Sequence, residues 1–294
     1  MKATVPHIAL LLGLLLLTGT ALADDSTDRD RARQLLDEGE DAAARKLVES
    51  MIEQQPQDAD LWVLLATAHH HALEKASLLR KRHWAGQQKG ALEQALDLDP
   101  NHIEARAELA DFYYYAPGIV GGSKTKAGQQ LALLERTSPY DAHWRRALHA
   151  RSENDHQGAV DAFRSALAAR PGDVQARFGL ALHLGELASF DEAFELHEEL
   201  IAEDPEGVKG PYYQIGRLAV ISGQRAERGI ACLEHYLEVA DSQSRPPKAY
   251  GHWRLGALLL RQGDREGGLR HLNRALYLSP GLEGAQKDLR EAGG

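Results

Sequence analysis

Three consecutive histidines, His69, His70 and His71, form the densest group of metal-ligand side chains in the sequence. Imidazole nitrogens together with a carboxylate such as Asp111 would suit zinc or a similar ion. Adjacent residues of a helix point to different faces, however, and two histidines that share an ion on one helix stand four residues apart. We therefore predict no metal site here, and we assign the histidines farther along the chain to packing or surface positions.

A near match to a phosphate-binding loop begins at Gly118 and ends in Ser123-Lys124-Thr125. Ser123 stands where such a loop needs glycine so that the backbone can approach phosphate, and no strand precedes it. Cys232 lies in an apolar stretch, which favours a buried thiol over a nucleophile. No acid/base pair is distinguished by its spacing, and no Gly-x-Ser-x-Gly or His-Glu-x-x-His motif occurs. The sequence therefore predicts neither catalysis nor a cofactor.

The overall composition is that of an ordinary globular protein, with 43% apolar residues among 294. A single cysteine excludes an intramolecular disulfide and a zinc site built from several thiolates. The formal net charge of −9 argues against a general nucleic-acid binder, because neutralising phosphates requires clustered lysine and arginine.

The first 23 residues have the pattern of a secretory signal peptide. Lys2 precedes an apolar core over Ile8–Leu17, and Ala21-Leu22-Ala23 supplies the small residues of a cleavage site. The core is too short for a comfortable membrane span, so we expect cleavage after Ala23, with an uncleaved anchor as the alternative. The expected location is the periplasm of a Gram-negative bacterium, or otherwise the outside of the cell, with no membrane span after cleavage.

A repeated frame organises the rest of the chain. A small or polar residue is followed by mostly apolar residues at +4 and +7 and by proline at +12. Six occurrences share this frame, and the period is about 34 residues. The gap between the last two prolines holds two units, of which residues 209–245 lack the proline. The frame begins at Ala44, Gln88, Ala127, Ala159, Ala193 and Gly268, and its prolines are Pro56, Pro100, Pro139, Pro171, Pro205 and Pro280.

Each unit also has an upstream half, such as Trp62, Leu65 and Ala66 in the second unit and Leu255-Gly256 in the seventh. Together the two halves resemble the tetratricopeptide repeat over about residues 25–281. The resemblance implies an all-α fold, a right-handed superhelical solenoid of about seven helix-turn-helix repeats. It gives a repeat domain over 24–281, followed by a capping helix and tail over 282–294.

Two segments depart from the repeat, near residues 70–85 and 114–121. The second unit predicts an overlong first helix from Leu61 towards Trp84, carrying the basic run from Arg80 to Trp84. That run is interpreted either as a solvated helix extension or as a docking patch for an acidic partner or lipid headgroup. The segment Tyr114–Gly121 is an insertion between the two helices of its unit, and one interpretation places it at the edge of a ligand site. The residues Gly122–Ala127 are predicted to form the turn into the second helix.

The resemblance also implies that the first helix of each repeat lines a concave groove. The groove-facing fifth position is aromatic in four consecutive units. Rigid aromatic rings and arginine dominate binding hot spots, so a groove for a peptide is one interpretation, and packing between repeats is the other. The candidate partner-binding residues are Trp144, Phe178, Tyr213, Trp253, Tyr114, Tyr115, Arg151, Arg217 and Arg261.

These observations predict a non-enzymatic scaffold of the cell envelope that binds a protein or peptide partner in the groove. The alternative is an accessory protein of envelope transport that captures a small ligand or a metal ion. The content of metal after purification would separate the two.

Overall fold

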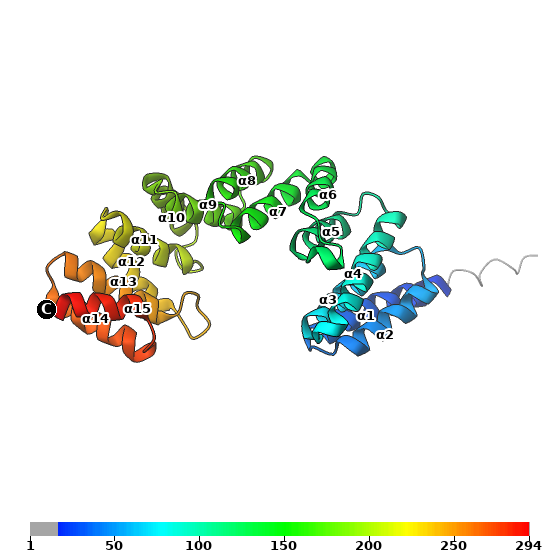
Figure 1. Cartoon of the computed structure of the whole chain (residues 1–294), viewed down its shortest axis with the longest axis horizontal. Coiled ribbons are helices and arrows are strands. Elements are labelled where there is room, and N and C mark those ends of the chain that lie inside the picture. Colours follow the sequence, from blue (N-terminus) through cyan, green and yellow to red (C-terminus); the bar gives the residue numbers. More distant parts are fainter. Residues whose placement is uncertain (1–16, 294) are drawn as a thin grey trace, which may run out of the picture. The chain divides into compact units, whose positions relative to one another are not determined.

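The structure, a computed structural model, describes residues 17–293, with side chains from Ser26 onward. The apolar core expected for a signal peptide lies almost wholly outside these residues. The described part contains fifteen α-helices, one short 3-10 helix and no strand, which confirms the all-α prediction (Figure 1). The helices are α1 (Leu17–Asp37), α2 (Asp41–Gln54), α3 (Ala59–Lys75), α4 (Leu78–Leu98), α5 (Ile103–Tyr115), η1 (Gly118–Val120), α6 (Lys124–Thr137), α7 (Pro139–Ser152), α8 (His156–Ala169), α9 (Val174–Glu186), α10 (Phe190–Glu203), α11 (Gly210–Ser222), α12 (Ala226–Val239), α13 (Lys248–Arg261), α14 (Arg265–Leu278) and α15 (Glu283–Gly293).

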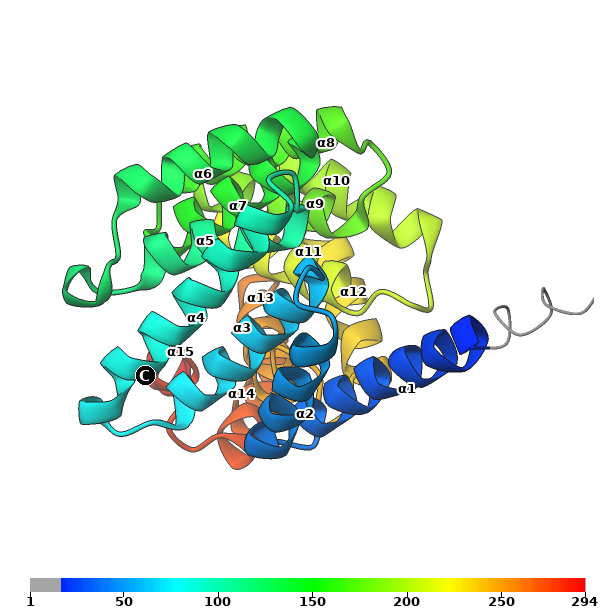
Figure 2. The same ribbon diagram turned by 90° about the vertical axis from the view of Figure 1, so that its right-hand side faces the viewer.

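The chain forms two compact units, which we call unit 1 (up to Ala142) and unit 2 (from His143). In both units consecutive helices pair as antiparallel hairpins, as the repeat predicts. The core of unit 1 includes Leu61 and Leu92, and that of unit 2 includes Phe163 and Leu233. Figure 2 shows the hairpins of the chain from a second direction.

Aspartates begin several of these helices. An aspartate just before the first turn accepts a hydrogen bond from a free backbone N–H, and such a cap contributes about 1 kcal/mol. The same arrangement recurs in both units, in the turns after two of the repeat prolines and in the turns within two hairpins. The caps are Asp58 on Leu61 N (3.3 Å), Asp155 on Gly158 N (2.9 Å), Asp173 on Ala176 N (2.7 Å) and Asp264 on Gly267 N (2.8 Å).

Small residues bring the two helices of a hairpin together. A Cβ added at Gly256 would lie 3.0 Å from the carbonyl oxygen of Gly268 and 3.0 Å from the side chain of Leu272. Ala159, which has the same place in the repeat frame as Gly268, is fully buried in the second helix of another hairpin. The glycines and alanines of the repeat frame therefore set the distance between the helices.

Replacing Gly256 with leucine should overpack this contact and cost roughly 1–3 kcal/mol of unfolding free energy. The exposed Lys287, replaced with glutamine, should change it by less than about 0.5 kcal/mol. Denaturant unfolding of the two variants checks this expectation, and equal midpoints would show that the helices are not held at contact distance by Gly256.

The second hairpin differs from the sequence prediction. The prediction of one overlong first helix towards Trp84 was wrong, because α3 ends at Lys75 and the 21-residue α4 begins at Leu78. Ser77 precedes α4 in an extended conformation, and serine favours this position before a helix. The additional length therefore lies mainly in the second helix, and the basic run opens that helix.

The segment between α5 and α6 is a turn, as expected, but Tyr114 and Tyr115 belong to the end of α5 and not to the inserted loop. Gly121 takes a φ of +104°, and the Ser123 hydroxyl accepts a hydrogen bond from Lys126 N at 3.3 Å, which caps α6. A Cβ at Gly122 would lie 1.7 Å from the carbonyl oxygen of Ala116, so only glycine fits there. The resemblance to a phosphate loop is thus explained by the needs of a tight turn.

At the other end of the chain, α15 covers the last hairpin. Leu282 and Ala285 are buried with Leu272 and Ala275 of α14. None of the helices within the described residues is long and apolar enough to cross a bilayer.

Candidate functional site

The first helices of the hairpins form the inner side of unit 2. Helix α11 contacts α9 and α13, and α13 also contacts α15, whereas no comparable contact joins α10 to α12 or α12 to α14 in the described residues. Helices that lie closer together occupy the inside of a curve. Figure 1 shows α8 and α10 on the outer side of unit 2 accordingly. A ligand groove in this unit would thus be lined by α9, α11, α13 and α15.

Three of the four aromatic rings at the repeated fifth position pack across their own hairpin. Each contacts a ring on the second helix of the same hairpin, and Tyr213 is only 3% exposed. The packing interpretation therefore accounts for Tyr213, whose ring is not available to a partner in this structure. The ring centroids are 5.7 Å apart for Trp144 and Phe163, 5.5 Å for Phe178 and His197, and 5.5 Å for Tyr213 and Tyr236.

Trp253 is held in a different way. Its ring packs over Gly284, where a Cβ would lie 2.1 Å away, and its Nε1 donates a hydrogen bond of 2.7 Å to Asp288 of α15. The Arg254 guanidinium stacks on the same indole, 3.9 Å from its centroid. Trp253 thus joins α13 to α15 and supports an arginine at the same time.

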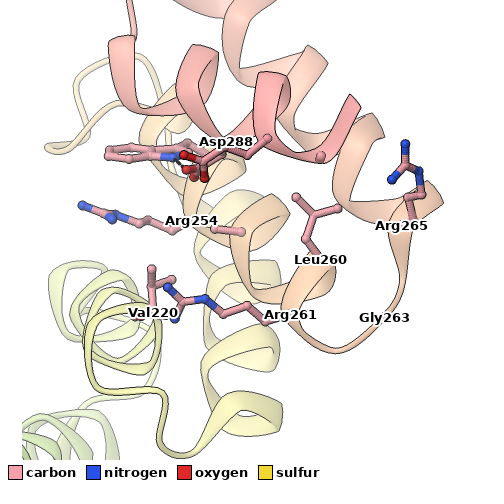
Figure 3. Close-up of a pocket in the computed structure, with 11 residues that line it drawn as sticks. Val220, Arg254, Leu260, Arg261, Gly263, Arg265 and Asp288 are labelled. Carbon is pink, nitrogen blue, oxygen red and sulfur yellow. Dashed lines mark hydrogen bonds between the residues drawn. The ribbon is translucent and has the colours of Figure 1, made fainter. Parts of the chain in front are cut away.

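A pocket of about 520 Å³ opens between α11, α13 and α15 (Figure 3). Helices α11 and α13 are first helices and the capping helix α15 packs beside α13, so the pocket lies on the inner side of unit 2, with Arg265 at the start of α14 on its edge. Its wall combines the indole and short apolar side chains with three arginines and two carboxylates. The lining residues are Val220, Trp253, Arg254, Ala257, Leu260, Arg261, Gly263, Arg265, Asp288, Glu291 and Ala292.

Arg254 is the most distinctive group of the pocket. It has no ion pair among the described residues, and its Nε is buried without a hydrogen-bond partner. In Figure 3 it lies between Asp288 and Arg261, and its side chain extends in the same direction as that of Arg261. A guanidinium stacked on an indole keeps its in-plane N–H groups free for a ligand, which favours bidentate binding of a carboxylate.

Arg217 and Arg261 show how successive repeats differ. Arg217 of α11 reaches back to Glu186 at the end of α9 and forms an ion pair with it. Arg261 of α13 reaches back in the same way to α11, where it donates to the carbonyl oxygen of Val220. A carbonyl does not neutralise the cation, so Arg261 brings uncompensated charge to the pocket, whereas the charge of Arg217 is already paired.

The other predicted residues lie elsewhere. Arg151 is exposed on α7. Tyr114 and Tyr115 belong to unit 1, where their rings meet edge to face at 5.0 Å and Lys124 lies 5.4 Å from the Tyr114 centroid. Tyr115 is half exposed. The structure thus brings Trp253 and Arg261 together and does not join them to Tyr114 or Tyr115 within one unit.

The histidine run points in three directions. His71 meets Asp41 at 3.2 Å, His70 faces Glu74 at 3.6 Å, and His69 is buried beside Trp84 with its Nδ1 unpaired. Burial, aided by nearby Arg45, lowers the pKa of His69 to about 4. In the part of the chain that the structure describes, no three side chains of the metal-binding types gather around one point.

Cys232 is buried between helices, and burial raises the pKa of its thiol to about 11. A thiol with such a pKa remains protonated at neutral pH and is a poor nucleophile. This agrees with the buried thiol predicted from its apolar neighbours.

Sequence reasoning missed Arg254, Arg265 and Asp288. Arg254 directly follows Trp253 and therefore does not occupy the fifth position of the repeat, on which the prediction relied. Asp288 lies in the capping helix, which has no full repeat frame to indicate its direction. The sequence did contain a signal for Arg254. Among the four aromatic residues at the fifth position, only Trp144 and Trp253 are followed by arginine.

Stacked helical hairpins with a pocket on their inner side define a helical repeat protein with an open binding surface. Sequence models of the tetratricopeptide repeat match residues 26–68 and, in two overlapping segments, 126–174 and 145–208. These segments of the chain are tetratricopeptide repeats. No curated protein matches it in sequence.

Solved structures support the fold. A tetratricopeptide repeat protein from Parabacteroides merdae is 18% identical with a TM-score of 0.52, and the match covers 92% of this chain and 98% of that one. PilF of Pseudomonas aeruginosa is 14% identical with a TM-score of 0.57, over 79% and 97% of the two chains. Yeast Tom70 is 15% identical with a TM-score of 0.52, over 86% of this chain and 51% of its own. These likenesses concern the fold.

Proposed function

We propose that this protein is a non-enzymatic scaffold that binds a segment of a partner protein on the inner side of unit 2. Tetratricopeptide repeats form protein-interaction surfaces, and here the pocket between α11, α13 and α15 is the proposed point of attachment. The partner segment carries a carboxylate for Arg254 and Arg261 and an apolar side chain for the wall of Ala257 and Leu260.

One observation carries this proposal, the unpaired state of Arg254. A guanidinium with a buried, unpartnered Nε has lost hydration without gaining a protein partner, which is costly. Asp288 accepts the indole N–H of Trp253 and forms no ion pair with Arg254 among the described residues. A ligand carboxylate would supply an acceptor for the terminal N–H groups of this guanidinium, while the stacked indole holds the guanidinium in place.

A peptide selection tests the proposal. The full chain is immobilised and challenged with a phage-displayed library of random peptides, and we expect enrichment of sequences with an acidic residue near an apolar one. Against a synthetic copy of the best peptide, Arg254→Gln and Arg261→Gln should each weaken binding roughly tenfold or more.

Arg270→Gln is the matched control, because Arg270 is exposed on α14 and pairs with Glu266 outside the pocket. It should leave the peptide affinity within about twofold of the unaltered chain. Equal losses for Arg254→Gln and Arg270→Gln would show that only the general charge matters and would contradict the pocket.

We further propose that the scaffold works in the cell envelope, after cleavage behind Ala23. The support is the sequence of residues 1–23, with its apolar core and small residues at the cleavage site. Intact-mass measurement on the exported protein should give a chain that begins at Asp24. A mass that retains residues 1–23 would contradict cleavage and favour the uncleaved anchor.

A further inference from the structure

The tip of the α3–α4 hairpin carries the two most exposed large apolar side chains of the described residues. Leu78 is 87% and Leu79 is 95% exposed, and both belong to the first turn of α4. Neither takes part in the hydrophobic core of unit 1. Single exposed leucines are common on protein surfaces, but two adjacent leucines with this degree of solvent exposure have no role in the packing of the fold.

Three cations follow directly. Arg80, Lys81 and Arg82 are all exposed, and none has an ion pair in the described part of the chain, although the protein as a whole is acidic. Helix stability does not account for them, because positive side chains in a first turn oppose the helix dipole and α4 has no acidic residue there.

The hairpin geometry presents this group outward. Helix α4 has 21 residues, whereas most second helices have 14, which adds roughly 10 Å of helix at the known rise per residue. The beginning of α4, in cyan, lies at the lower left of Figure 2. We call the segment Leu78–Arg82 the basic tip.

We propose that the basic tip is a docking site for an anionic membrane surface, with Leu78 and Leu79 inserted among the lipids and the three cations on the headgroups. Charge complementarity selects this occupant, since clustered lysine and arginine are attracted to anionic lipid. The two leucines favour a lipid surface over an acidic protein as the partner. A protein partner would need an apolar pocket to enclose the projecting pair, whereas the pair can insert directly into a bilayer. The inference is independent of the pocket in unit 2.

A fluorescent probe at the tip tests this in the full chain. Leu79→Cys is labelled with a polarity-sensitive fluorophore, and buried Cys232 should stay unlabelled. With vesicles of equal parts phosphatidylglycerol and phosphatidylcholine we expect a blue-shifted emission, and with pure phosphatidylcholine no shift. Because the probe reports only its own position, membrane contact by residues 1–23 does not produce this signal.

The charges are tested in the same labelled background. Replacing Arg80, Lys81 and Arg82 with glutamine should weaken vesicle binding roughly fivefold per cation. Replacing Arg270, Lys287 and Arg290 instead changes the net charge equally and should leave the shift intact. The probe at Tyr277→Cys, a second exposed apolar site on α14, should not shift.

Three results would overturn the proposal. The probe at position 79 could remain in water with anionic vesicles, or shift equally on pure phosphatidylcholine, which would mean apolar adhesion alone. Binding to soluble polyglutamate through the three cations, without any vesicle binding, would assign the tip to an acidic protein instead. Matching thermal unfolding of all variants confirms that each comparison concerns a folded chain.

Discussion

Lowering the pH from about 7 to about 5 should remove about 2 kcal/mol of the unfolding free energy of unit 2 through His197 alone. Burial, with a smaller contribution from Arg217, lowers the pKa of His197 from 6.5 to about 3, and the residue is 1% exposed. At a pH between these two pKa values, His197 binds a proton in the unfolded chain but not in the folded chain. The stabilisation is therefore complete above about pH 6.5 and is lost as the pH falls towards about 3.

The matched variant is His197→Leu. Leucine occupies the same position of the repeat frame at Leu92, Leu131 and Leu272, so the replacement suits the fold and removes the titrating ring. Denaturant unfolding at both pH values should show a pH dependence smaller by about 2 kcal/mol in the variant. An unchanged dependence would mean that folding does not lower the pKa of His197. His69 should act in the same way in unit 1, where its pKa is about 4.

Tyr213→Ala should cost about 3–5 kcal/mol of unfolding free energy, because it removes a buried ring and leaves a cavity beside Tyr236. Tyr213→Phe retains the ring and should cost much less. Tyr115→Ala is the exposed control, with 54% of Tyr115 open to solvent, and we expect a change within about 1 kcal/mol.

Chemical denaturation of the three variants separates packing from partner binding at the fifth position of the repeat. A Tyr213→Ala protein as stable as the Tyr115→Ala protein would contradict the packing interpretation. It would return Tyr213 to the set of residues available to a partner.

The repeat frame was enough to predict the hairpins. Its prolines follow the second helices, and its small residues, such as Gly256, lie where the structure brings two backbones together. These features are local, since they depend on the shape of one side chain against the neighbouring helix. For the same reason the turn around Gly121 and Ser123 could be distinguished from a phosphate loop without coordinates.

The direction of the aromatic side chains could not be predicted in this way. Trp144 and Trp253 share a position in the repeat, yet one packs on Phe163 and the other on Gly284 and Asp288. Trp144 packs on the second helix of its own hairpin, whereas Trp253 packs on the capping helix α15, which lies beside α13 and has side chains of its own. The break before α4 was missed because no glycine or proline marks it in the sequence, and only the backbone shows the extended conformation of Ser77.

The central claim is that a partner segment binds between α11, α13 and α15. Hydrogen–deuterium exchange of the full chain, with and without the selected peptide, measures this most directly. We expect the peptide to slow exchange in Trp253–Arg261 and in α15, and to leave the outer helices α8 and α10 unchanged. Protection of α8 and α10, with α13 and α15 unaffected, would place the partner on the outer side and contradict the account.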